Sequence, residues 1–222
     1  MTAAGVHQAR PGAAPGPPAP HLRAGLRLAG LHLVSRRVPA ALGVLAGLGA
    51  VLWAALRWHW NIAGGPAAQQ VIPLVIETAT AGVIAVTTYG PFGEPERATG
   101  RWLPWLRLAT AVGLTAAAVG ALAAGATGGY LPGGSLALLR NVGGMAGIGL
   151  LAAAVLGGAL AWAGPMAYLL IAESALAAGW TTPWIWPARP PHDTGAAICA
   201  GLVFAAGLAV FTVRGARISA RE

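Results

Sequence analysis

Long apolar stretches dominate this chain, and short polar segments separate them. Six of these stretches approach the ~20 residues that a helix needs to cross the hydrocarbon core of a bilayer. They cover residues 38–57, 68–89, 104–124, 135–157, 159–180 and 194–213. This pattern predicts an all-α, polytopic integral membrane protein with six transmembrane helices.

The least distinct boundary lies between the fourth and fifth stretches. Residues 141–180 contain Glu173 as their only charge, and this segment is about twice as long as one span. We therefore place the turn at Gly157 and Gly158. A turn at Gly164 and Pro165 is the alternative.

The N-terminal region divides into two parts. Residues 1–21 are rich in Pro, Gly and Ala and have no apolar period, which predicts a disordered tail. Residues 22–37 carry Leu22, Leu26, Ala29 and Leu33 on one helical face and arginines to one side, which predicts a helix lying in the cytoplasmic interface. Leu28 and Leu31 fall on the far side, so an early start of the first span stays open. The transmembrane domain then covers 38–214, and 215–222 form a cytoplasmic tail.

Composition excludes an ordinary soluble fold. Charged residues make up 9% of the chain, against the ~25% that is usual for soluble domains. Hydrophobic residues make up 56%, and the mean hydropathy is +0.66. With so little polar surface, the chain requires the lipid bilayer as its partner.

The positive charge predicts an orientation. All 14 basic residues are arginines, and the net charge is +8. They lie at the ends of apolar stretches and form no basic stripe, so we expect no nucleic-acid partner. Eleven of them fall on the side of the N-terminus, which predicts a plasma (inner) membrane protein with both termini cytoplasmic. Tryptophans gather at both predicted boundaries, the outer with Trp58, Trp60, Trp180, Trp184 and Trp186, the inner with Trp102, Trp105 and Trp162.

Catalytic chemistry finds no support in the sequence. The absence of lysine excludes a Walker A lysine and a Schiff-base lysine. The five histidines all lie outside the predicted spans, so no intramembrane Ser/His pair or histidine metal cluster is expected. We predict no enzyme, no metal site and no cofactor.

Three ionisable residues do fall within predicted spans: Glu77, Arg140 and Glu173. A charge in the bilayer centre costs ~2.5–3.5 kcal/mol on insertion scales, so such residues are candidates for function. Counting ~1.5 Å per residue places Arg140, Glu173 and Glu77 about 8, 10 and 13 Å from the outer ends of their spans. We expect Arg140 to pair with Glu173 or Glu77. The alternative to a functional site is an internal salt bridge that only locks helices together.

The predicted cytoplasmic loop after the second span is unusually polar. Its charged and aromatic residues are Phe92, Glu94, Glu96, Arg97, Arg101 and Trp102. A short amphipathic helix there would lie at the membrane face and dock on a cytoplasmic partner. A solvated loop whose arginines only set the topology is the alternative.

Glycines in the fourth span permit close helix packing. Gly143 and Gly147 match a small-xxx-small pattern, which suits packing within the subunit or a dimer seam.

A family resemblance arises from these features together. An interfacial helix over 22–37, six spans and a polar loop over 91–102 resemble a small actinobacterial permease subunit of an ABC transporter, of the type-2 exporter class. The motifs similar to that class are Gly93-Glu94-Pro95-Glu96-Arg97, Leu103-Pro104-Trp105-Leu106-Arg107 and Leu139-Arg140-Asn141. The resemblance implies that 22–37 form an elbow helix and that the polar loop couples to a separately encoded ABC ATPase. It also implies a homo- or heterodimer of permease subunits, with export of an unidentified substrate.

One feature departs from that class. The class has short helices between the fifth and sixth spans, whereas residues 181–193 are short and contain Pro183, Pro187, Pro190 and Pro191. Such a loop can dip toward the bilayer but hardly form two half-helices. An accessory or immunity-like membrane protein without transport activity is therefore the alternative function. A proton-coupled carrier using Glu77 or Glu173 is a third, although no internal repeat is apparent.

Overall fold

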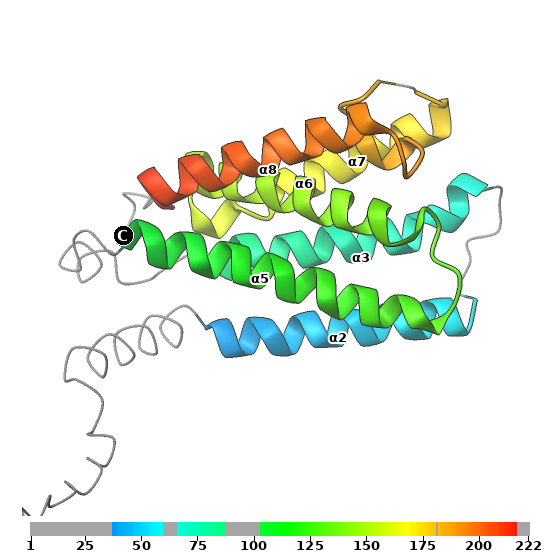
Figure 1. Cartoon of the computed structure of the whole chain (residues 1–222), viewed down its shortest axis with the longest axis horizontal. Coiled ribbons are helices and arrows are strands. Elements are labelled where there is room, and N and C mark those ends of the chain that lie inside the picture. Colours follow the sequence, from blue (N-terminus) through cyan, green and yellow to red (C-terminus); the bar gives the residue numbers. More distant parts are fainter. Residues whose placement is uncertain (1–36, 60–65, 88–102, 181, 217–222) are drawn as a thin grey trace, which may run out of the picture.

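The computed structural model describes residues 37–59, 66–87, 103–180 and 182–216, and all regular elements in these ranges are helical. Six long helices run side by side (Figure 1). Their bounds are α2 Val38–Arg57, α3 Pro66–Thr87, α5 Leu103–Gly125, α6 Gly134–Leu156, α7 Ala163–Ala178 and α8 Thr194–Arg214. Single turns of 3-10 helix lie between them: η2 Ala126–Gly128, η3 Gly158–Leu160 and η4 Trp186–Ala188.

The six predicted spans are confirmed as six helices long and apolar enough to cross a membrane. Most ends fall within two residues of the prediction. The turn between the fourth and fifth spans lies at Gly157, where φ is 93°, a backbone conformation that suits glycine. Helix α7 begins later than predicted, at Ala163, because η3 and a short turn take up the residues after Gly157.

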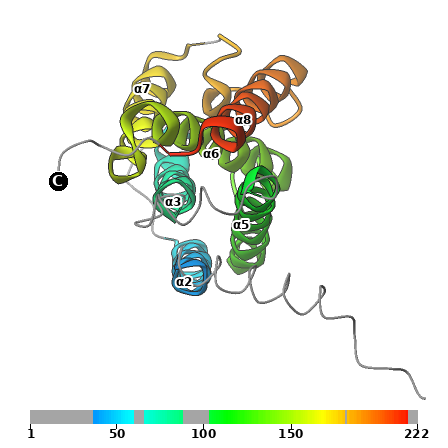
Figure 2. The ribbon, with the colours of Figure 1, turned by 90° about the vertical axis from the view of Figure 1, so that its left-hand side faces the viewer.

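Helix α6 occupies the centre of the bundle. It packs against α8, α3, α7 and α5, whereas α2 lies on the far side of α3 and α5 (Figure 2). Of the apolar segment of α6, 67% is buried inside the bundle, which is the largest share among the six helices. The smallest share, 22%, belongs to α8. Residues on α6 are therefore the best placed to form a site inside the bundle.

Glycines on α6 allow close contact with α8 and with Trp186 of the α7–α8 loop. A Cβ at Gly147 would lie 2.6 Å from the Cα of Phe204 on α8, and one at Gly144 would lie 2.6 Å from the ring of Trp186. By contrast, a Cβ at Gly143 would meet nothing within 4 Å. Gly147 thus serves packing within the subunit, and Gly143 faces open space.

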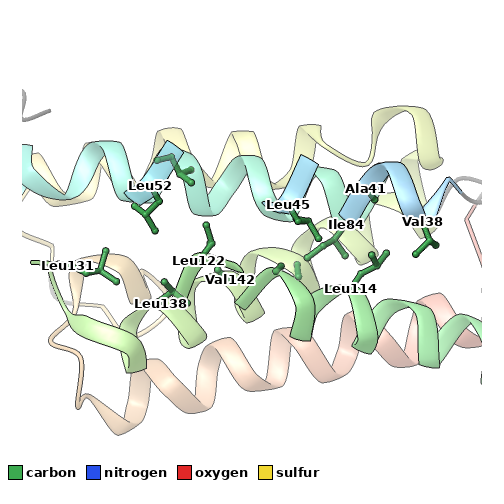
Figure 3. Close-up of a cluster of buried hydrophobic side chains, with 13 residues drawn as sticks. Val38, Ala41, Leu45, Leu52, Ile84, Leu114, Leu122, Leu131, Leu138 and Val142 are labelled. Carbon is green, nitrogen blue, oxygen red and sulfur yellow. The ribbon is translucent and has the colours of Figure 1, made fainter. Parts of the chain in front are cut away.

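The largest hydrophobic core lies between α2, α3, α5 and α6. Side chains from all four helices meet there (Figure 3), with Leu45, Leu52, Ile84, Leu122 and Val142 almost fully buried. This core is apolar along its length, so the polar groups of the bundle must lie elsewhere.

One end of the bundle carries the end of α2, the start of α3, and the α5–α6 and α7–α8 connections, and we call it the loop end. The other end carries the start of α2 and the end of α8, so the first and last spans begin and end on the same side (Figure 1). The predicted interfacial helix over 22–37, apart from Arg37, and the coupling loop from Phe92 to Trp102 lie outside the described residues.

Candidate functional site

The α7–α8 loop folds back onto the loop end of the bundle. Trp186 in η4 is only 2% exposed, and its ring stacks on Tyr168 of α7 with 4.5 Å between ring centroids. The Tyr168 hydroxyl also donates a hydrogen bond to the carbonyl of Trp184, at 2.9 Å. The prediction that Trp186 belongs to an outer aromatic belt is wrong, because Gly144 leaves room for its ring inside the bundle. Trp58, Trp180 and Trp184 are exposed, as a belt requires.

Arg140 on α6 holds this loop by its backbone. Its two terminal nitrogens donate hydrogen bonds to the carbonyls of Pro190, at 2.8 Å, and Arg189, at 3.0 Å. The side chain is 7% exposed, and its Nε is buried without a hydrogen-bond partner in the described chain. The guanidinium is therefore fixed in position, and no carboxylate of the described residues is in direct contact with it.

Asp193 links the loop to α8. Its Oδ1 accepts a hydrogen bond of 2.8 Å from the backbone N–H of Ala196, which caps the N-terminus of α8. Its Oδ2 accepts hydrogen bonds from the Arg189 guanidinium, one of them 2.8 Å long from Nε. The Ala196 N–H and then the Arg189 side chain hold the pKa of Asp193 below its ordinary value, because both stabilise the charged form.

Glu77 on α3 faces α6 and is 4% exposed. Its Oε2 accepts a hydrogen bond of 2.9 Å from the side-chain amide of Asn141. The amide oxygen of Asn141 is buried without a partner among the described groups. One turn nearer the loop end, Pro73 supplies no N–H to the carbonyl of residue 69, which interrupts the hydrogen bonding of α3 beside the site.

These groups line a cavity of about 210 Å³ at the loop end. Its walls come from α3, α6, the end of α7 and the α7–α8 loop. The polar lining residues are Gln70, Glu77, Arg140, Asn141 and Arg189. We call this space the polar cavity. Its polar lining residues carry one carboxyl group, two amides and two guanidinium groups that could bind a small polar molecule or water.

The structure brings together two of the three predicted intramembrane residues. Glu77 and Arg140 line the same cavity, but no ion pair joins Arg140 to either glutamate in the part of the chain that the structure describes. The pair that the sequence suggested is replaced by bonds to loop carbonyls, because the loop reaches Arg140 at the end of α6. Glu173 on α7 does not line the cavity, and its buried Oε1 has no partner among the described residues.

Sequence reasoning missed Gln70, Asn141 and Arg189 in the cavity lining, and Tyr168 and Asp193, which hold the α7–α8 loop. An amide inside an apolar stretch, directly after Arg140, is a signal that identifies Asn141. Asp193 directly before an apolar run has the pattern of a helix N-cap. The loop carbonyls that bind Arg140 have no sequence signal. Within the described residues, no group of three His, Cys, Asp or Glu side chains could hold a metal ion.

Comparisons with protein-family models, with curated proteins and with solved structures give no match to this chain. Its function must therefore be argued from its own residues.

Proposed function

We propose that this chain is the membrane-spanning permease subunit of an ATP-driven ABC exporter in the plasma membrane, energised by a separate ATPase chain. The observation that carries the proposal is the burial of Glu77 and Arg140 inside a spanning bundle, beside a cavity at its loop end. Ionisable groups are costly there, and they are characteristic of pathways for polar substrates. The polar cavity would form the outward part of such a pathway.

The role of ATP hydrolysis in this proposal rests on the family resemblance. The loop with Phe92, Glu94, Glu96, Arg97, Arg101 and Trp102 would receive the movement of the ATPase and pass it to α3 and α5, which flank it in sequence. Because the polar cavity of one subunit is small, the working transporter would contain two permease subunits, identical or related.

Copurification tests this proposal. The tagged full-length chain is isolated from its native membrane in mild detergent, and vanadate-sensitive ATP hydrolysis is measured in the eluate. We expect ATPase activity with the wild type and at least ~10-fold less with a triple variant Glu94→Ala, Glu96→Ala and Arg97→Ala, since docking energies of ~1.4 kcal/mol already change occupancy tenfold. The control variant Arg217→Ala with Glu222→Ala changes charge in the C-terminal tail and should keep the activity. The proposal fails if the wild type brings no ATPase, or if the triple variant matches the control.

A second arm tests the polar cavity. Glu77→Gln removes the ionisable carboxyl group but keeps an amide that can bond to Asn141. In the reconstituted complex we expect this variant to insert normally and to lose substrate-stimulated or basal ATP turnover. Unchanged turnover would reduce Glu77 to a structural contact.

An accessory membrane protein without transport is the second candidate function. The observation that favours it is the bonding of Arg140 to the carbonyls of Arg189 and Pro190, which is what a clamp between helix and loop requires. Under this function, the full-length chain would copurify with another membrane complex, and Glu77→Gln would change nothing but stability.

A further inference from the structure

A second and larger space lies on the other side of Arg140. It is a groove of about 500 Å³ between α5, α6 and α8, within the ~300–1,000 Å³ range of ligand sites. We call it the lateral groove. Its wall residues are Thr115, Leu139, Gly143, Ala197, Gly201 and Phe204. Gly143 and Gly201 both face the open space of the groove, because a Cβ at either would meet nothing within 4 Å.

The groove faces the lipid side of the bundle. Leu136 and Leu139 at its rim are 52% and 54% exposed, and the nearby Leu202 on α8 is 65% exposed. Thr115 is satisfied within its own helix, because its hydroxyl donates to the carbonyl of Ala111 at 2.8 Å. In a membrane these walls contact acyl chains, so the ligand that suits them is apolar over most of its length.

The length of the groove matches one leaflet. Along α8 it extends from Thr194 to Phe204, which at ~1.5 Å per residue is about 15 Å. The hydrocarbon core of a bilayer is ~30 Å thick, so this distance is the depth of one leaflet. A single acyl chain lying along α8 would place its headgroup at the loop end.

The polar end of the groove has two arginines, Arg140 in its lining and Arg189 beside it, to one carboxylate, that of Asp193. Arg140, His192, Asp193 and Thr194 line it there. Both carboxylate oxygens of Asp193 are already engaged, one by the Ala196 N–H and the other by Arg189. Among the described residues no carboxylate contacts Arg140 directly, so its guanidinium is the cation at this end that can contact an anionic group, and guanidinium suits phosphate.

We infer that the lateral groove is a binding site for an anionic phospholipid, with one acyl chain between α5 and α8 and the phosphate near Arg140. This site does not depend on the proposed transport activity, because the purified chain alone carries all the residues involved. The polar cavity and the lateral groove thus share Arg140 and take ligands of different chemistry.

Lipid titration of the purified full-length chain tests the site. The delipidated protein in detergent is titrated with phosphatidylglycerol or phosphatidylcholine, and bound lipid is counted by native mass spectrometry. We expect one saturable phosphatidylglycerol per chain, bound about tenfold more tightly than phosphatidylcholine. Gly143→Leu and Gly201→Leu fill the groove and should each abolish this binding. Gly43→Leu on α2 is the matched control, because a Cβ there also meets nothing within 4 Å, and it should bind as the wild type does.

Three results would overturn the inference. They are equal binding of the two lipids by the wild type, retention of binding by Gly143→Leu and Gly201→Leu, and loss of binding in Gly43→Leu as well. Arg140→Gln adds a test of the headgroup contact. It should remove the preference for phosphatidylglycerol while one lipid still binds, and an unchanged preference would contradict the assignment of the phosphate to Arg140.

Discussion

Glu77 and Asn141 join α3 to α6 through a buried hydrogen bond of 2.9 Å. Each lies in an apolar span, where lipid offers a polar group no hydrogen bond. Their contact therefore orients the two helices as well as the site. Arg140, the next residue to Asn141, points its guanidinium toward the loop instead of toward Glu77. Two adjacent residues of α6 thus hold two different elements.

A double-mutant cycle measures the Glu77 and Asn141 contact. We expect Glu77→Ala and Asn141→Ala to be non-additive by about 0.6 kcal/mol and by no more than ~1.7 kcal/mol, the average and the maximum for hydrogen bonds between membrane helices. The measurement is the free energy of unfolding in mixed micelles. Thr110→Ala is the control partner, because the Thr110 hydroxyl bonds to its own helix at Leu106, and its effect should add to that of Glu77→Ala. Additivity of Glu77→Ala with Asn141→Ala would show that the hydrogen bond contributes nothing.

Asp193 makes the stability of the loop end depend on pH in the acidic range. The folded-state pKa of Asp193 lies below its ordinary value of ~3.9. The charged Asp193 therefore stabilises the fold fully at pH values above ~3.9, and this stabilisation is lost as the pH falls through the lower, folded-state pKa. The melting temperature of the wild type should therefore fall from about pH 5 to pH 3 more than that of Asp193→Asn, which keeps a helix cap but does not titrate. Parallel pH profiles of the two proteins would contradict this assignment.

Helices α6 and α8 share the most extensive helix–helix interface of the described bundle, with backbone against backbone at Gly147. Gly147→Ala would place its Cβ 2.6 Å from the Phe204 Cα, and neither backbone can move without separating the helices. We expect a loss of about 1–3 kcal/mol in unfolding free energy, as for other overpacked sites.

Gly43→Ala is the matched control for this prediction. It lies in open space on α2, so it should be neutral or stabilising by the ordinary preference of helices for Ala. If both variants lose the same free energy in the micelle unfolding assay, the loss comes from helix propensity and not from the α6 and α8 contact.

At the scale of elements, the sequence was sufficient for the spans and insufficient for the connection that forms the site. The bounds of α2 follow from the apolar run between Arg37 and Arg57, because the bilayer thickness alone fixes its length. Trp186 could not be placed, because its burial depends on Gly144 of another helix. The partners of Arg140 are backbone carbonyls, and these depend on the path of the loop. Residue types cannot reveal that path.

The described part of the whole molecule has an even number of candidate spans, so both ends of the described bundle lie on one side (Figure 1). The arginines that predict its orientation lie in segments outside the described helices. Among the described arginines, Arg37, Arg107 and Arg214 lie at one end, and Arg57, Arg140 and Arg189 at the other. The predicted bias therefore comes from the arginines of 1–36, 88–102 and 217–222.

Cysteine labelling tests the orientation. In a Cys199→Ala background, which removes the only native cysteine, His192→Cys and Arg217→Cys are treated with a membrane-impermeant maleimide in intact cells. We expect position 192 to be labelled from outside and position 217 only after permeabilisation. The reverse pattern would place the polar cavity and the phospholipid site on the cytoplasmic face.

The clamp at the loop end also limits which parts of the bundle can move. Arg140 fixes the α7–α8 loop to α6, Asp193 fixes the same loop to α8, and Gly147 locks the two helices along their length. Sliding of α8 along α6 would break all of these contacts together. The two helices therefore act as one mechanical unit. Any conformational cycle of this protein must pivot on the interfaces around that unit, those of α6 with α3 and of α8 with α5, which border the polar cavity and the lateral groove.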